Sequence, residues 1–285
     1  MTIATTIIDG ITTRYEVLGE GPPLLMYAPG GLDATIEKWR TQGIYADLQF
    51  LEELSRHFTC ITFDRRECGL SGGRVERVDW SDYVRQGKGL LEHLGHEKAF
   101  LMGGCMGCSV VAAFGVAHPE MVMGMVLFWP VGGARYRLSG HQRFAEHLAF
   151  VNQNGLQAVV ELAKSGTKPF GADPRSGPWV SVLRHDEGFV RNYLALDVDR
   201  YKAIVAGMAR TLYDRDTVPG AEPEDLLCLD SPALIIPGAD ASHATSAARY
   251  LQECIPGSQY WDVPVSAQSR TDTNARVIEF LKSGI

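Results

Sequence analysis

The sequence has little that would direct it to nucleic acid, to a membrane or into a secretory pathway. Its net charge is −7, and its 27 lysines and arginines are scattered, with Arg65-Arg66 as the sharpest cluster. A basic patch for nucleic acid or anionic lipid is therefore not expected. The opening stretch MTIATTIIDG lacks a basic start and a long apolar core, so we expect no signal peptide and a cytoplasmic protein.

Long charge-free runs are also scarce. Residues 99–117 carry no charge, but four glycines, one serine and two cysteines interrupt them. A run of this length could cross a membrane, yet a buried strand followed by a buried helix accounts for it better. Because no secretion signal accompanies the six cysteines, we expect free thiols in a reducing compartment.

The chain instead alternates short apolar strands with helical stretches, which is typical of a parallel sheet covered on both faces. This alternation stops at Ala134 and resumes near residue 228, and the helical stretches between them lie at 142–164 and 189–213. We therefore predict an α/β fold with an eight-stranded, mostly parallel sheet. Residues 1–133 and 228–285 would form the core, and residues 134–227 a helical cap inserted after the sixth strand.

The run MGGCMGCSVV, residues 102–111, places two cysteines three residues apart. A Cys-x-x-Cys pair at the start of a helix can be a redox centre, because the helix end favours the thiolate. Structural zinc needs about four ligands, and the sequence has no second Cys-x-x-Cys. A third interpretation fits more features. Gly103-Gly104-Cys105-Met106-Gly107 matches the strand-to-helix turn that presents a nucleophile, with cysteine where serine is commoner.

With this turn the chain resembles the α/β-hydrolase fold family over nearly its whole length. YAPGG resembles the family's oxyanion loop, with Pro29 at the usual histidine position, and DRRECGLS resembles its Asp-x-Arg-Gly-x-Gly-x-Ser turn, with Glu67 replacing the first glycine. ALIIPGADASH resembles the strand and turn that supply the catalytic acid. In having a cysteine at the nucleophile position, the chain resembles the dienelactone hydrolase-like members of the family.

The resemblance implies a role for each site residue. Cys105 would be the nucleophile and Asp240 the acid, and the N–H groups of Met106 and Gly31 would bind the oxyanion. Asp240 could instead be a turn residue or a helix cap. Cys108, three residues along the helix from Cys105, could pair with it on oxidation, although a buried packing role suits it better.

The family's catalytic histidine is missing from its usual place, the loop before the final helix. The last histidine of the chain is His243. His243 itself could be the base, or a cap histidine (His141, His147 or His185) could reach Cys105. Alternatively, a thiolate stabilised by its helix could attack without a base, although water would then lack activation.

The predicted cap combines aromatic and cationic side chains, some of which should line a pocket above the sheet. They are Arg135, Tyr136, Arg137, His141, Arg143, Phe144, Trp179, Arg184 and His185. Arginine suits a carboxylate or another anion, so the partner we expect is a small-molecule substrate, with an anionic one suggested. We expect no cofactor, metal, nucleic acid or membrane partner. The oligomeric state stays open, with a homodimer as one option.

These features predict a hydrolase that uses Cys105 covalently on an ester, thioester, lactone or related carbonyl. The absent histidine keeps two other interpretations open. One is a lyase, isomerase or acyltransferase on the same fold, and the other is a ligand-binding protein without catalysis. The strained turn argues against the last of these.

Overall fold

A computed structural model describes residues 2–284 of the chain. Eight strands form one sheet with the order β1-β2-β4-β3-β5-β6-β7-β8. The strands are β1 (Thr2–Ile8), β2 (Ile11–Leu18), β3 (Pro23–Tyr27), β4 (Thr59–Phe63), β5 (Ala99–Gly104), β6 (Val122–Phe128), β7 (Ala233–Ile236) and β8 (Gln259–Tyr260). β1 and β2 run antiparallel to their neighbours, whereas β3 to β8 are parallel to one another. The predicted fold class is confirmed.

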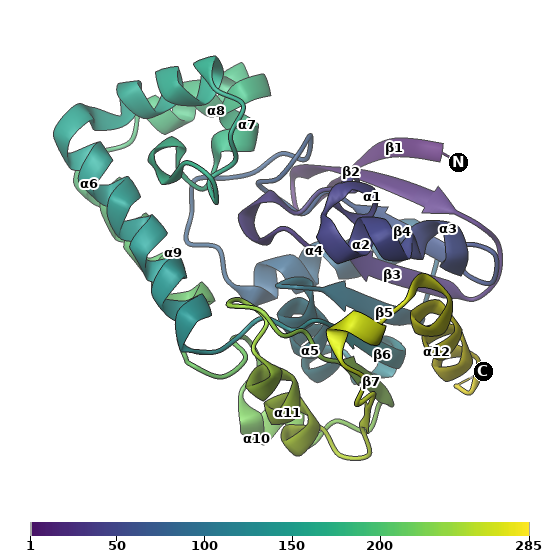
Figure 1. The fold of residues 1–285 in the computed structure, drawn as a ribbon. Helices are drawn as coiled ribbons and strands as arrows, with labels where there is room; N and C mark the ends of the chain where they lie inside the picture. The colour runs from purple at the N-terminus through teal and green to yellow at the C-terminus, as the bar shows by residue number, and fades with distance from the viewer. Residues whose placement is uncertain (1, 285) are drawn as a thin grey trace.

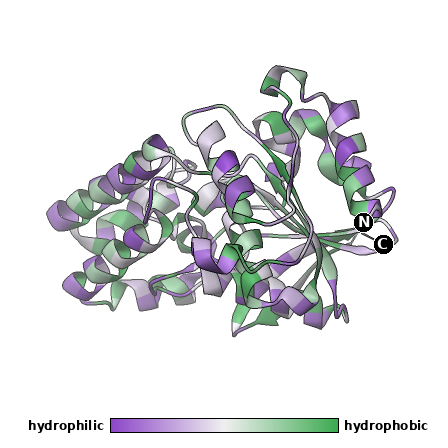
Figure 2. Cartoon of the chain, turned by 90° about the horizontal axis from the view of Figure 1, so that it is seen from below, coloured by the Kyte–Doolittle hydropathy of each residue, from purple (hydrophilic) through white to green (hydrophobic). Residues whose placement is uncertain are grey.

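The central parallel strands β3, β5, β6 and β7 are apolar because both faces of the sheet are covered (Figures 1 and 2). On β3, Leu25 and Tyr27 pack toward one set of helices, and Leu24 and Met26 toward the other. This alternation follows from the two-residue period of a strand. The first set consists of the helices at residues 80–93, 107–117 and 245–254, and the second of those at 38–41, 43–48, 50–54 and 270–282.

The helices occupy much of the remaining chain. They are α1 (Lys38–Thr41), α2 (Gly43–Leu48), α3 (Phe50–Leu54), α4 (Trp80–His93), α5 (Gly107–Ala117), α6 (Ala134–Ser165), α7 (Val180–His185), α8 (Glu187–Leu194), α9 (Val198–Leu212), α10 (Pro223–Leu226), α11 (Thr245–Cys254) and α12 (Arg270–Lys282). The charge-free run 99–117 is β5 followed by α5, as predicted. Among the helices of residues 2–284, none combines the length and the apolarity needed to cross a bilayer.

Two stretches whose apolar residues have a helical spacing are each interrupted. Within residues 45–57, Gln49 adopts a left-handed conformation (φ 51°) and separates α2 from α3. Within 189–213, Asp197 is extended and its carboxylate accepts the N–H of Arg200, so a new helix begins there. An aspartate that caps a helix start is a strong local signal. The sequence analysis gave it too little weight.

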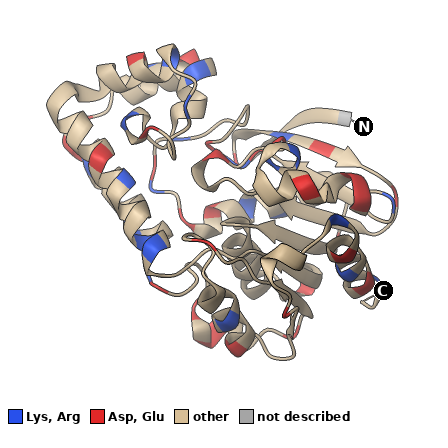
Figure 3. Cartoon of the chain, in the orientation of Figure 1, with Lys and Arg blue, Asp and Glu red and all other residues tan. Residues whose placement is uncertain are grey.

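Helices α6 to α10 connect β6 to β7 and form what we call the helical insertion, residues 134–227 (Figure 1). α6 bends at Gly155, whose φ of 75° lies outside the helical region. Lysines and arginines alternate with acidic residues along both the insertion and the core (Figure 3). The Trp179 Nε1–H group donates to the carbonyl oxygen of Arg74 at 2.9 Å, which attaches the insertion to the core.

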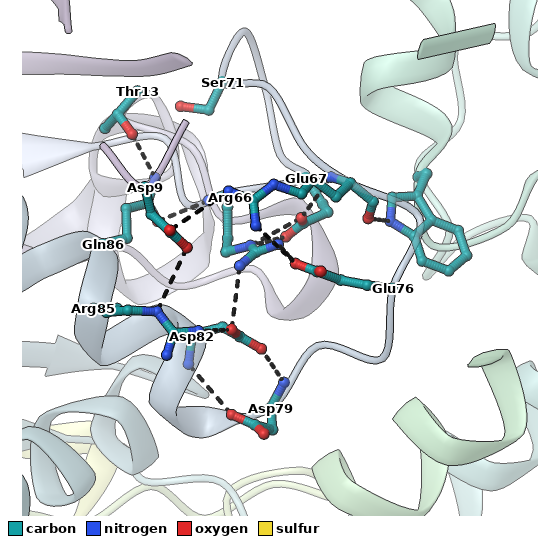
Figure 4. A network of polar contacts seen from close by, with 12 residues as sticks. Asp9, Thr13, Arg66, Glu67, Ser71, Glu76, Asp79, Asp82, Arg85 and Gln86 are labelled. Atoms are coloured by element: carbon teal, nitrogen blue, oxygen red, sulfur yellow. Dashed lines mark hydrogen bonds and ion pairs between the residues drawn. The ribbon is translucent and has the colours of Figure 1, made fainter. Parts of the chain in front are cut away.

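The turn after β4 carries the substitution of glycine by glutamate noted in the sequence. Glu67 adopts a φ of 65°, and its buried carboxylate accepts from Arg66 Nε at 2.9 Å. Arg66 also pairs with Glu76 and Asp82 (Figure 4). Burial raises the pKa of Glu67 to about 7, although Arg66 opposes this shift. Glu67 therefore has a backbone conformation that glycine would adopt more easily. Its side chain belongs to a buried network of paired, hydrogen-bonded charges.

Candidate active site

Cys105 lies at the sharp turn between β5 and α5, with a φ of 56°. Such a conformation costs free energy for a residue with a side chain, so the surrounding structure must hold it in place. The Cys105 N–H donates to the carbonyl oxygen of Phe128 at 3.2 Å, and the Cys105 carbonyl accepts from Cys108 N–H at 3.1 Å. These bonds to β6 and α5 fix the turn that presents the sulfur.

Glycines on both sides of Cys105 let the strand and the helix approach each other. A Cβ atom placed on Gly103 would lie 2.5 Å from the carbonyl group of Gly107. One placed on Gly107 would lie 2.5 Å from the carbonyl oxygen of Tyr27. Both contacts are with backbone, which cannot yield as a flexible side chain can.

Gly107→Ala is therefore expected to lower the free energy of unfolding by about 1–3 kcal/mol, the cost typical of forcing extra volume into a packed site. Gly171→Ala is the matched control, because a Cβ there meets no atom within 4 Å and the backbone has no positive φ. Urea denaturation of both variants measures the difference. Equal stabilities would show that the turn is not tightly packed.

The two cysteines of the run differ in environment. The Cys105 side chain is partly exposed and opens into a cavity of about 260 Å³. Cys108 is fully buried, and its S–H group lies within 3.1 Å of the Gly103 carbonyl oxygen. All six cysteines are free thiols, and within residues 2–284 no three His, Cys, Asp or Glu side chains cluster closely enough to hold a metal ion.

The cavity lies between the core and the helical insertion. It is lined by Gly30, Gly31, Asp33, Lys38, Gln42, Cys105, Met106, Tyr136, Arg143, Pro169, Gly171, Tyr213, Ser242 and His243. Four of the five residues that the sequence analysis named as catalytic or oxyanion-binding therefore line the cavity: Gly31, Cys105, Met106 and His243. The fifth, Asp240, lies behind His243.

Asp240 and His243 come from the loop after β7. The imidazole Nδ1 atom lies 2.9 Å from both carboxylate oxygens of Asp240. The N–H groups of Ser242 and His243 donate to the same carboxylate at 2.8 and 3.0 Å, so the loop fixes its own acid. The other ring nitrogen, Nε2, is buried and has no hydrogen bond of good geometry within residues 2–284.

The loop is held in place from two sides. Gly132 N–H donates to the Ser242 carbonyl oxygen at 3.0 Å, which ties the loop to the segment after β6. The ring of Trp129 lies 5.5 Å from that of His243. A Cβ atom on Gly238 would lie 2.6 Å from the His243 Cβ, so glycine is needed for this close approach.

The electrostatics of the site favour a charged pair. Burial favours the neutral thiol of Cys105, but His243 and the N–H groups of Gly30 and Met106 outweigh it and lower the pKa of Cys105. Burial likewise disfavours the imidazolium, yet Cys105 and Asp240 raise the pKa of His243 to about 9. The start of α5 adds to this effect, because a helix N-terminus favours negative charge. The lowered pKa of Cys105 and the raised pKa of His243 both favour a thiolate–imidazolium pair over two neutral groups.

The backbone N–H groups that lower the pKa of Cys105 are those of Gly30 and Met106. Met106 was expected from the sequence. Gly30 was not, because neighbouring glycines in a loop give no signal of which amide points inward. Gly31, the residue we expected, also lines the cavity, and its carbonyl oxygen accepts from the Arg65 guanidinium.

The sequence analysis missed Arg65, a buried cation behind the cavity wall. Its Nη2 atom contacts the Gly31 carbonyl and lies 3.8 Å from the sulfur of Met106, and its guanidinium carbon lies 4.3 Å from the Tyr83 ring centroid. Nε and Nη1 are buried and have no hydrogen-bond partner among the described residues. No carboxylate pairs with Arg65 within residues 2–284, so its charge acts on the neighbouring groups.

The loop that usually carries the family's histidine contributes Gln268 instead. Its side-chain oxygen accepts the Trp129 Nε1–H at 2.7 Å, and its amide donates to the Pro237 carbonyl at 2.8 Å. Gln268 thus supports the tryptophan that packs against His243. No sequence signal distinguished it from an ordinary loop glutamine.

The three alternative histidines lie elsewhere. His141 contacts the carbonyl oxygen of Tyr213 at 2.9 Å, and His147 is buried within the insertion, 2.6 Å from the Tyr201 hydroxyl. Burial lowers the pKa of His147 to about 4. His185 is exposed at the end of α7. None of the three lines the cavity, whereas His243 does.

Comparison with known proteins agrees with the architecture. Residues 23–162 match the family described as alpha/beta hydrolase fold. No curated protein matches the chain significantly in sequence. Several solved structures match nearly its full length at low identity, which establishes a shared fold.

Three of these structures illustrate the range. A meta-cleavage product hydrolase from Pseudomonas fluorescens IP01 is 19% identical, with 99% of this chain and 98% of that chain covered and a TM-score of 0.62. An enol-lactonase from Burkholderia xenovorans LB400 is 18% identical, with 98% and 97% covered and a TM-score of 0.59. An esterase from Rhodococcus sp. ECU1013 is 21% identical, with 99% of both covered and a TM-score of 0.63.

Proposed function

We propose that this chain, which has the α/β-hydrolase fold, is an enzyme that hydrolyses a small ester, thioester or lactone through a covalent thioester on Cys105. The observation that carries the proposal is that Cys105 and His243 line the same cavity, while Asp240 contacts the far ring nitrogen of His243. Nucleophilic catalysis requires a nucleophile, a base that takes its proton, and an acid that orients the base. The position of His243, on the cavity wall and bonded to Asp240, supports its assignment as the base.

In the first half-reaction the Cys105 thiolate attacks the substrate carbonyl carbon and forms a C–S bond. Negative charge moves to the carbonyl oxygen, where backbone N–H groups of Met106 and the Gly30-Gly31 loop stabilise it. The bond to the leaving oxygen or sulfur then breaks, and His243 Nε2 gives its proton to that atom. The products are an acyl thioester and a neutral alcohol or thiol.

In the second half-reaction the charge on the sulfur is gone, so the largest contribution that raised the pKa of His243 is gone too. His243, which became neutral when it gave its proton to the leaving group, stays neutral more readily and accepts a proton from water through Nε2. The water oxygen attacks the thioester carbon, the C–S bond breaks, and the thiolate leaves. The acid is released, and the thiolate–imidazolium pair is restored.

The helical insertion serves as the cap of this site in our proposal. Tyr136, Arg143 and Tyr213 come from it and line the cavity opposite the core residues. A cavity of about 260 Å³ suits a small substrate. A nucleophilic thiol also needs a reducing environment, so we place the protein in one, in keeping with its six free cysteines.

Reaction with p-nitrophenyl acetate tests the proposal. We expect a burst of one nitrophenolate per chain, an acetyl group mapped by mass spectrometry to Cys105 rather than to the other five cysteines, and steady turnover. Absence of acylation, or acylation at another cysteine, would contradict covalent catalysis and favour the ligand-binding or lyase alternatives. Release of the acetyl group only to an added thiol or amine would replace hydrolysis by acyl transfer.

A further inference from the structure

The charges of the side chains that line the cavity do not sum to zero. Asp33 and Lys38 form an ion pair at 2.9 Å, and Cys105 and His243 form the catalytic pair. The remaining charged side chain in the lining is Arg143 of α6. Arg143 is partly buried and has neither an ion pair nor a hydrogen bond within residues 2–284. The cavity therefore carries one uncompensated positive charge.

A second unsatisfied donor lies on the same wall. The Tyr136 hydroxyl is buried beside the side chain of Tyr213, but it makes no hydrogen bond of good geometry among the described residues. Burial raises the pKa of Tyr136 well above its usual value, so the hydroxyl keeps its proton and can donate it. A buried polar group without a partner is costly, and a ligand oxygen would relieve that cost.

A further positive charge lies behind the cavity wall. Arg65 is buried behind Gly31 and Met106 and has no carboxylate partner in residues 2–284. The free polar groups around the cavity are thus mainly donors and cations: the Arg143 guanidinium, the Tyr136 hydroxyl, His243 Nε2 and the backbone amides. A ligand that complements them is rich in acceptor oxygens and negatively charged.

We propose that the substrate carries a carboxylate, and that Arg143 and the Tyr136 hydroxyl bind this group while the reacting carbonyl lies at Cys105. The inference rests on the proposed function and adds the substrate class to it. The class is short acyl compounds with a free carboxylate, such as half-esters or half-thioesters of small dicarboxylic acids and lactones that bear a carboxylate. The small cavity holds both groups only when few carbons separate them.

Alkylation of Cys105 with iodoacetate and iodoacetamide tests the anion site without any need for turnover. The two reagents have the same size and differ in charge. Their rate ratio is measured on Cys105 by mass spectrometry and divided by the ratio for free glutathione. In the wild type we expect a normalised preference for iodoacetate of about tenfold, in line with one charge-assisted hydrogen bond, and saturation with iodoacetate.

Arg143→Gln is expected to abolish this preference, because a neutral side chain no longer attracts the carboxylate of iodoacetate. Arg143→Lys should retain part of the preference, because the charge stays but the bidentate geometry is lost. Arg137→Gln is the matched control. Arg137 lies on the same helix, pairs with Asp216 at 3.3 Å and does not line the cavity. Equal ratios in the wild type and Arg143→Gln would overturn the proposal.

A substrate pair separates this inference from the proposed function. Mono-p-nitrophenyl succinate and p-nitrophenyl butyrate have acyl chains of similar length, and only the first has a carboxylate. We expect a higher kcat/KM for the succinate, lost in Arg143→Gln. If both esters acylate Cys105 equally, the anion site is wrong and the cysteine chemistry stands. If neither ester reacts while iodoacetate is still preferred, the proposed function fails and the anion site stands.

Discussion

Cys105→Ser is expected to slow acyl-enzyme formation from p-nitrophenyl acetate by about 100-fold or more at neutral pH. The site stabilises the ionised thiol of Cys105. A serine hydroxyl would stay protonated there, because a hydroxyl proton is far harder to remove than a thiol proton. His243 would have to act as a neutral base from the start. The substitution changes one atom and keeps the backbone, so thermal stability should stay the same. Stopped-flow nitrophenolate bursts on both proteins measure the effect.

Cys108→Ser is the matched control for this substitution. Cys108 is buried on the same helix, and its S–H group lies near the carbonyl oxygens of Gly103 and Phe128, which a serine hydroxyl can also reach. We expect acylation at nearly the wild-type rate. If Cys105→Ser were acylated at the wild-type rate, or if only Cys108→Ser lost acylation, Cys105 would not be the nucleophile.

His243→Gln is expected to raise the pH at which Cys105 becomes reactive by more than about one unit. In the wild type, His243 outweighs burial and lowers the pKa of Cys105. Without the imidazole, burial remains and favours the neutral thiol. With an alkyl ester, whose alkoxide needs a proton to leave, the wild-type acylation rate should rise with pH through the lowered thiol pKa and fall above about 9, where His243 loses that proton.

The variant should show only the rising limb, displaced to alkaline pH, and its acyl-enzyme should persist because no base activates water. Rates of acylation and of acyl release across the pH range measure both effects. His185→Gln is the control, since His185 is exposed at the end of α7. An unchanged pH profile in His243→Gln would remove His243 from the mechanism.

The core of the fold follows from local patterns in the sequence. β3, β5, β6 and β7 are short, wholly apolar and bounded by turns, because each is buried on both faces. The turn at Cys105 was predictable for a related reason. Gly103 and Gly107 are required by close backbone approach, and that requirement leaves a fixed spacing in the sequence.

The less predictable parts depend on tertiary contacts. β8 is only two residues long, although the sequence around it reads as a longer strand. The position of His243 could not be settled from its three-residue spacing to Asp240, since the loop path is fixed by the bond from Gly132 N–H. Arg65 gave no signal either. Its lack of a carboxylate partner is a property of the folded packing.

Ultraviolet titration of the thiolate tests the central claim most directly. The absorbance of the wild type minus that of Cys105→Ser, followed from acidic to alkaline pH, reports ionisation of this one sulfur. The ion pair with His243 predicts a single step with a midpoint below about 8.5, the value of a free cysteine, and an upward shift of that step in His243→Gln. A wild-type midpoint at or above that value would contradict a poised thiolate and the chemistry built on it.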